Sequence, residues 1–171
     1  MSGRDSQRTK VYAAEQFVRT LFDRTAERGN QVVEFFGAQL TLPPEARFAS
    51  VASVQAYVDD VLAHPRIRSG WPGAAPLTIR ARRGATAAHY EVVDGRAVIA
   101  VPERQTTWAL RELVVLHEIA HHLSQAEPPH GPAFVSTFCD IAEAVMGPEV
   151  AHVLRVVYAK EGVRQGGGST G

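Results

Sequence analysis

Two histidines and a glutamate carry the strongest chemical signal in the chain, in the stretch His117-Glu118-Ile119-Ala120-His121. In an α-helix, residues four apart lie about 40° apart around the axis and one turn apart along it, so both imidazoles project from one side. Two nitrogens placed in this way can each approach a zinc ion at about 2 Å. The spacing therefore predicts that His117 and His121 bind a common metal ion.

Glu118 lies about 100° around the same helix from His117, beside the ion but away from its ligands. A carboxylate in that place can accept a proton from metal-bound water, because zinc lowers the pKa of that water to about 7. The proton can then pass to a leaving amine. Glu118 is therefore the predicted general base of a hydrolytic reaction.

A catalytic zinc site needs a third protein ligand and one open position. His130 is the predicted third ligand, because the short connector 124–129 can turn the chain back and Gly131-Pro132 holds its end ahead of another helix. Three imidazoles favour Zn²⁺ over other divalent ions, and one catalytic ion is expected. Carboxylates with a less defined local setting are the alternatives for the third position: Glu127, Asp140 and Glu143.

Other polar side chains are weaker candidates for a role at this site. His122 points about 100° away from His121, so it should support a ligand or lie at the surface. A tetrahedral intermediate needs a hydrogen-bond donor for its oxyanion. Three side chains are candidates for that role, although ordinary packing accounts for each of them: His89, Tyr90 and Tyr158.

Hydrophobic periodicity predicts the helices that position these residues. The helix that carries the two histidines should run from a cap at Thr106 or Thr107 to about Ser124. Apolar residues recur at helical spacing in the other segments, which end at glycine or proline: 6–28, 51–64, 132–146 and 149–162.

Alternating or apolar β-prone segments predict four strands, at 31–42, 77–83, 87–93 and 96–101. Asp94-Gly95 favours a tight hairpin turn between the last two. The expected fold is α+β, with a small antiparallel or mixed sheet of three or four strands packed by about five helices, and with the histidine helix central. An extended peptide could pair with an exposed edge strand, for which 96–101 is the first choice.

Composition and charge describe an ordinary globular chain. Its 171 residues suffice for one domain, expected at 1–164, with a flexible Gly/Ser-rich tail at 165–171. Eighteen basic residues balance eighteen acidic ones, which gives no sign of a nucleic-acid or anionic-membrane partner. No apolar run is long enough for a membrane span. With Cys139 as the single cysteine, a reducing, cytoplasmic setting is expected.

The stretch from Leu113 to Leu123, followed by His130-Gly131-Pro132-Ala133-Phe134, resembles an actinobacterial family of HExxH metallohydrolases. More broadly, it is similar to the SprT-like small zincin peptidases. The resemblance covers residues 106–138. It implies a zincin-like fold with a sheet before the zinc helix, and a peptide or protein substrate.

By this resemblance His117, His121 and His130 would be zinc ligands and Glu118 the catalytic base. SprT-like proteins that act on DNA-bound substrates often carry a cysteine zinc ribbon. A chain with one cysteine cannot form such a ribbon, so a DNA-repair role is not expected.

Three other functions remain open. The chain could hydrolyse a non-peptide amide, or act on a repressor partner as a regulatory protease resembling the ImmA/IrrE family. It could also be a non-catalytic binding module that zinc stabilises. A fourth protein ligand would support that last alternative, whereas an open coordination position would argue against it.

Overall fold

The structure, a computed structural model, describes residues 4–83, 87–102 and 110–166. Its elements belong to two compact units. Unit 1 comprises Met1–Pro44 and Ser124–Gly171, and unit 2 comprises Glu45–Leu123. Together the described residues form an α+β structure with six helices and two small sheets. The single domain expected at 1–164 stays a prediction.

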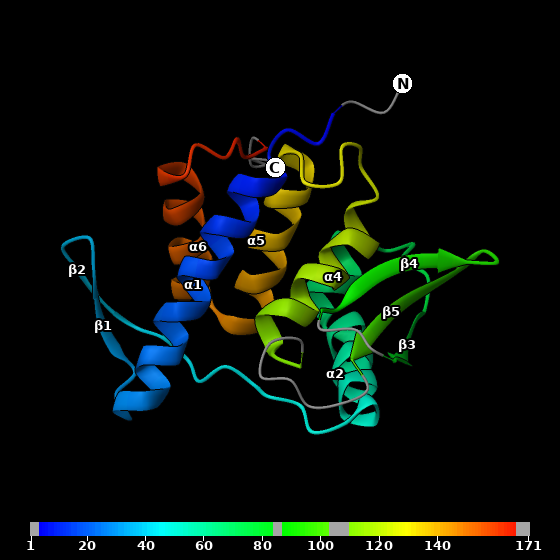
Figure 1. The fold of residues 1–171 in the computed structure, drawn as a ribbon, viewed down its shortest axis with the longest axis horizontal. Helices are drawn as coiled ribbons and strands as arrows, with labels where there is room; N and C mark the ends of the chain where they lie inside the picture. Colours follow the sequence, from blue (N-terminus) through cyan, green and yellow to red (C-terminus); the bar gives the residue numbers. More distant parts are fainter. Residues whose placement is uncertain (1–3, 84–86, 103–109, 167–171) are drawn as a thin grey trace. The chain divides into compact units, whose positions relative to one another are not determined.

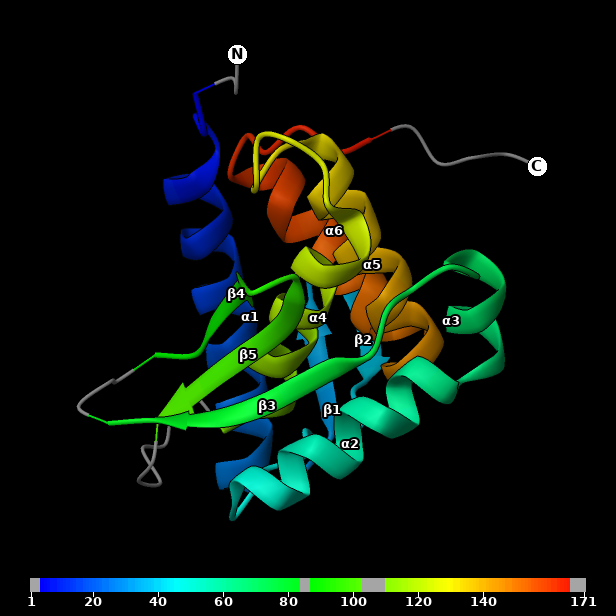
Figure 2. The same cartoon turned by 90° about the vertical axis from the view of Figure 1, so that its right-hand side faces the viewer.

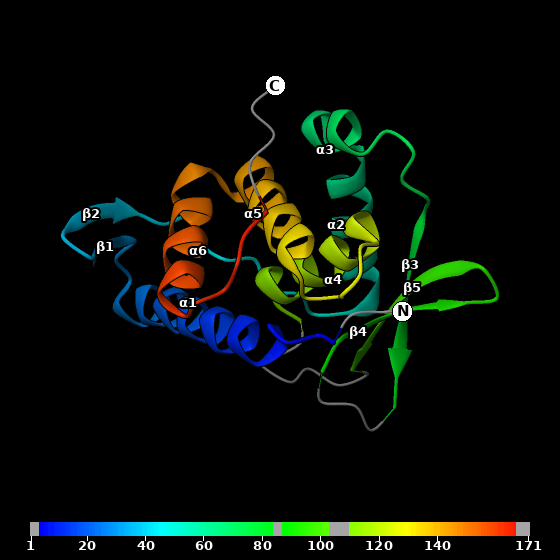
Figure 3. The ribbon, with the colours of Figure 1, turned by 90° about the horizontal axis from the view of Figure 1, so that it is seen from above.

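Unit 1 is built on three helices: α1 (Arg8–Arg28), α5 (Pro132–Met146) and α6 (Pro148–Lys160). The helix α6 packs against both α1 and α5 (Figures 1 and 3). Prolines open α5 and α6, where a missing N–H costs no helical hydrogen bond. The predicted helices 6–28, 132–146 and 149–162 are confirmed within two residues. Burial raises the pKa of Cys139, which lies in this core, to about 12.

The segment 31–42 was predicted as one strand of the main sheet, and this prediction is wrong. It forms a separate antiparallel hairpin of β1 (Val32–Phe35) and β2 (Ala38–Thr41). The turn residues Phe36 and Gly37 have φ values of 46° and 82°, the left-handed conformation that a tight hairpin turn requires. Phe35 is buried, and its ring meets His152 of α6 edge-on at 6.2 Å.

Unit 2 contains a three-stranded mixed sheet and three helices. Its strands are β3 (Leu77–Arg82), β4 (His89–Val93) and β5 (Arg96–Pro102), and its helices are α2 (Val51–Ala63), α3 (Pro65–Gly70) and α4 (Glu112–Ser124), whose last residue belongs to unit 1. The helix α2 packs against β3 (Figure 2). Ser50 caps α2 as expected. Asp94 and Gly95 form the predicted tight turn, with φ values of 49° and 75°.

The strand order β3-β5-β4 makes β5 central, so the prediction that 96–101 is an edge strand is wrong. The segment pairs in parallel with β3 and antiparallel with β4. The outer edge of β3 is occupied by Gln55, whose side-chain amide donates to the Leu77 carbonyl at 3.0 Å and accepts from the Ile79 N–H at 2.8 Å. The other edge strand of this three-stranded sheet is β4.

The helix α4 begins later than predicted. Thr106 and Thr107 lie outside the described residues, but Leu110 and Arg111 were expected to be helical and are not. Arg111 instead forms a β-bridge with Arg47, and the Leu110 carbonyl accepts from the Phe48 N–H at 2.9 Å. These contacts with residues 47 and 48 take the place of helical hydrogen bonds at residues 110 and 111. The helix therefore begins at residue 112.

None of the helices in the described part of the chain combines the length and the apolar character that spanning a bilayer requires.

Candidate metal centre

His117 and His121 lie one turn apart on α4, and the structure brings their rings together. The two Nε2 atoms are 3.2 Å apart, and the ring centroids are separated by 4.9 Å with the planes at 72°. His117 is buried and His121 is half-buried. The helix spacing therefore produces the convergence that the sequence predicts.

The separation of these nitrogens fits a shared metal ion. Two nitrogens bound at about 2.0–2.1 Å with a tetrahedral angle between them would be about 3.3 Å apart. The observed 3.2 Å agrees with that value. A hydrogen bond between one protonated and one unprotonated nitrogen has a similar length, so the pair can accept either a proton or a cation between its rings.

Glu118 is 8% exposed and follows His117 directly on α4. It shares the helix with both histidines, so its position relative to them is set by helical geometry alone. Its predicted role as general base stays a prediction.

The amino-terminal end of α4 is anchored to α2 and to the segment that precedes α2. Glu112 accepts from the Ala46 N–H at 3.1 Å and from the hydroxyl of Tyr57 in a very short hydrogen bond. Burial, followed by the charge of Glu112, raises the pKa of Tyr57 well above its usual value, so the hydroxyl keeps its proton and donates. These bonds hold the helix that carries His117 in one position within unit 2.

A buried ion pair reinforces the same anchor. Arg111 donates to both oxygens of Glu45, with Nε 3.0 Å from each, and the two side chains are 3% and 4% exposed. One oxygen of Glu45 also accepts from the Leu113 N–H in the first turn of α4, at 3.0 Å. The carboxylate thus neutralises Arg111 and satisfies a helix N–H that has no partner within the helix.

Replacing Glu45 by alanine should lower the free energy of unfolding by about 3–5 kcal/mol, because one member of a buried ion pair is removed and the other stays. Urea denaturation followed by circular dichroism measures this loss. The matched control is Glu91→Ala, which breaks an exposed pair with Arg80 and should cost much less. Equal losses in the two variants would contradict the anchoring role.

His122 is buried, and both of its ring nitrogens are engaged. Nε2 lies 2.7 Å from the Ala75 carbonyl, which can only accept, so this nitrogen carries the proton. Nδ1 then accepts from the Tyr90 hydroxyl at 3.2 Å, and burial raises the pKa of that hydroxyl. The Tyr90 ring also stacks on His121, with planes 16° apart and centroids 6.5 Å apart. Of the two places predicted for His122, beside a ligand or at the surface, the structure shows the buried one.

His130 belongs to unit 1, where it precedes Gly131, the residue before α5. Asp5 holds it twice: Oδ1 accepts from the His130 N–H at 3.1 Å, and Oδ2 lies 2.8 Å from Nδ1. The residue is 5% exposed, and its ring neighbours those of Tyr12 and Phe134, each with its centroid 5.2 Å away. His130 stays the predicted third ligand.

Local packing explains the residues that follow His130. A Cβ atom at Gly131 would lie 3.1 Å from both the ring and the carbonyl oxygen of Pro128, closer than ordinary contacts allow. Phe134, one turn into α5, is fully buried and meets the imidazole edge-on at 73°. The glycine permits a tight turn and the phenylalanine supports the ring, so the His-Gly-x-x-Phe pattern has a structural reason.

The other candidates have different surroundings. Asp140 and Glu143, two alternatives for the third ligand, face Arg155 at 3.2 and 3.4 Å within unit 1. Tyr158 is fully buried in the same unit, and burial raises its pKa well above the usual value. His89 is exposed on β4. Tyr90 contacts the histidine helix, through His122 and His121.

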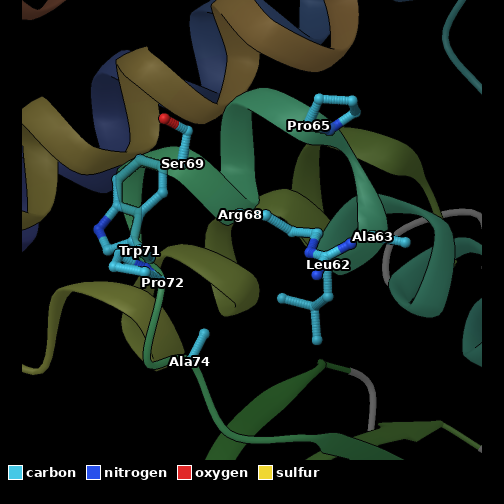
Figure 4. Close-up of a pocket in the computed structure, with 8 residues that line it drawn as sticks. All are labelled: Leu62, Ala63, Pro65, Arg68, Ser69, Trp71, Pro72 and Ala74. Carbon is cyan, nitrogen blue, oxygen red and sulfur yellow. The ribbon is translucent and has the colours of Figure 1, made fainter.

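A pocket of about 660 Å³ lies along α3 and the turn after it (Figure 4). Arg68 and Trp71 are among its lining residues, and the predicted ligands are not. The pocket therefore has no evident part in the chemistry of the histidine pair.

Sequence reasoning missed Asp5, Gln7 and the anchor formed by Glu45, Tyr57 and Glu112. None of these lies in a local motif. Their roles depend on contacts across 55 to 157 residues of chain.

Comparison of the chain with protein-family models, with curated proteins and with solved structures finds no match.

Proposed function

We propose that this chain is a zinc-dependent hydrolase, most simply a peptidase, in which His117, His121 and His130 bind one Zn²⁺ and Glu118 is the general base. The observation that carries the proposal is the 3.2 Å separation of the two Nε2 atoms on α4, which suits two ligands of one tetrahedral ion.

The third ligand rests on donor chemistry. Each of the three histidines offers a ring nitrogen that could bind a metal ion, and only nine positions separate His121 from His130 in the chain. An all-imidazole set suits zinc, copper, iron and nickel better than the oxygen-seeking ions magnesium and calcium. Three protein ligands would leave the fourth position of a tetrahedral ion for water.

Bound zinc would lower the pKa of its water and polarise a substrate carbonyl. The residues of the chain contribute proton transfer to this reaction. The Glu118 carboxylate takes one proton from the attacking water as the water oxygen forms its bond to the carbonyl carbon. It then returns that proton to the amine nitrogen as the carbon–nitrogen bond breaks. Glu118 carries the proton between the water and the amine, and the amine nitrogen keeps the electron pair of the broken bond. The reaction therefore needs no further acceptor.

The sheet supports a peptide as the substrate. The strand β4 is an edge among the described strands, and it carries Tyr90, whose ring stacks on His121. An extended peptide can pair with such an edge through main-chain hydrogen bonds, independently of its side chains. We therefore assign to β4 the edge role predicted for 96–101. A peptide paired with β4 would lie beside the histidine helix.

Metal analysis of the purified protein, together with cleavage of an unbiased peptide library, tests the proposal. One zinc per chain and cleavage that a chelator abolishes are expected. Zinc binding without cleavage of peptides or other amides would favour a non-catalytic zinc-stabilised module, and absence of metal binding would overturn the proposal.

A further inference from the structure

We infer that Asp5 is a positioning residue of this metal centre: its carboxylate holds His130 as the Nδ1–H tautomer and thereby presents Nε2 as the metal-binding nitrogen. The inference deepens the proposed function and rests on it. It assigns a role to the amino-terminal segment, which lies 125 positions away in the chain from the histidine that it contacts.

The contact between Asp5 and His130 uses both carboxylate oxygens. Oδ1 accepts from the backbone N–H of His130 at 3.1 Å, and Oδ2 lies 2.8 Å from Nδ1 of its ring. The Asp5 side chain is 24% exposed and that of His130 is 7% exposed. Because the carboxylate holds backbone and ring together, the imidazole has little freedom to rotate about its side-chain bonds.

Hydrogen-bond direction determines the tautomer. An ionised carboxylate can only accept, so Nδ1 must carry the proton that bridges it to Oδ2. A neutral imidazole has one N–H, which leaves the lone pair on Nε2. Metal-binding histidines use the same arrangement, in which a carboxylate on one ring nitrogen orients the ring and makes the other nitrogen a better ligand.

Gln7 fixes the segment that carries Asp5. Its side chain is 5% exposed and donates to the carbonyls of His130 and Arg164, at 3.1 and 3.2 Å. Its oxygen accepts from the Arg164 N–H at 2.5 Å. Three distant parts of unit 1 are thus joined at one buried amide. Gln7 therefore fixes the backbone near Asp5, in addition to the hydrogen bonds that the Asp5 side chain makes itself.

The substitution Asp5→Asn separates a positioning role from a merely structural one. The asparagine keeps the size and both contacts of Asp5, but its oxygen must face the backbone N–H of His130. Its NH₂ group then faces Nδ1 and donates to it, which forces the proton onto Nε2. The variant should fold like the original protein while holding the wrong tautomer.

Two readouts test this inference. Long-range ¹H–¹⁵N spectra of the metal-free protein, with the His130 signals assigned by a His130→Gln variant, should show the Nδ1–H tautomer in the original protein and Nε2–H in Asp5→Asn. Zinc affinity, measured by competition with a chromogenic chelator, should fall by about 10–100-fold in Asp5→Asn and in Asp5→Ala. Glu27→Gln removes an equal charge from an exposed position on α1 and should change neither readout.

The outcomes separate the inference from the proposed function. An Nε2–H tautomer in the original protein, or unchanged zinc affinity in both Asp5 variants, would overturn the role of Asp5 and leave the metal centre intact. Failure of the original protein to bind zinc would instead overturn the centre. The ring spectra need no metal, so they still report the contact between Asp5 and His130 in that case.

Discussion

Glu118→Gln protein is expected to keep one zinc ion per chain and to lose hydrolysis by about 10²–10⁴-fold. The amide of glutamine has nearly the shape of the carboxylate but cannot take a proton from water at neutral pH. The helix packing around residue 118 should survive, because the volume of the side chain hardly changes. Peptide cleavage by metal-loaded protein measures the loss, and metal content and thermal unfolding check that the site and fold persist.

The control for this variant is Glu149→Gln, which makes the same chemical change at an exposed position on α6. It should cleave like the original protein. If purified, metal-loaded Glu118→Gln hydrolysed peptides at the original rate, Glu118 would have no part in proton transfer, and the base would have to be sought elsewhere in the chain.

Alanine at position 117, 121 or 130 is expected to weaken zinc binding by more than the roughly 10–100-fold that loss of a supporting partner costs. Each substitution removes one coordinating nitrogen of the proposed three, so two protein ligands and water remain. Chelator competition on the three purified variants measures the effect. Thermal unfolding of the metal-free proteins distinguishes loss of a ligand from loss of the fold.

His122→Ala is the control for these three variants, because His122 lies on α4 with His117 and His121 and is buried as His117 and His130 are. It loses the hydrogen bonds to Tyr90 and Ala75 but no proposed ligand, so its zinc affinity should fall less than that of His130→Ala. Equal zinc content in these two variants would exclude His130 from the ligand set. Loss of zinc in Glu127→Gln would then identify the alternative carboxylate.

The anchoring of α4 bears on how these substitutions should behave. Glu45 and Glu112 tie its first turn to the segment 45–48 through buried hydrogen bonds. His117 and His121 therefore stand on a helix whose position within unit 2 does not depend on a bound ion. Substitution of a ligand should leave that helix in place, which is the condition for assigning a loss of zinc to the missing nitrogen.

Most helices could be predicted from the sequence because the information is local. Apolar residues at helical spacing specify which side of α1, α5 and α6 is buried, and proline or glycine specifies where each begins or ends. The same locality places His117, Glu118 and His121 on one helix. Their mutual geometry follows from the regular helix, whichever elements surround it.

Strand order and the hairpin at 31–42 required the tertiary structure. Phe36-Gly37 lies inside an apolar run, where its turn is hard to distinguish from a continuing strand. The central place of β5 depends on its parallel pairing with β3, a contact between segments whose connection passes through β4. Hydrophobic pattern shows that a strand is buried, but it does not say which strands lie on either side.

The sequence alone determined the types of the reactive groups and the convergence of the two histidines on α4, because a helix repeats every few residues. The tertiary structure determined which distant side chains position these reactive groups. Asp5 meets His130 and Tyr57 meets Glu112 across long stretches of chain, and these pairs form only when folding brings the segments together. No local pattern encodes such contacts, since hydrogen bonds between distant side chains depend on where whole elements pack.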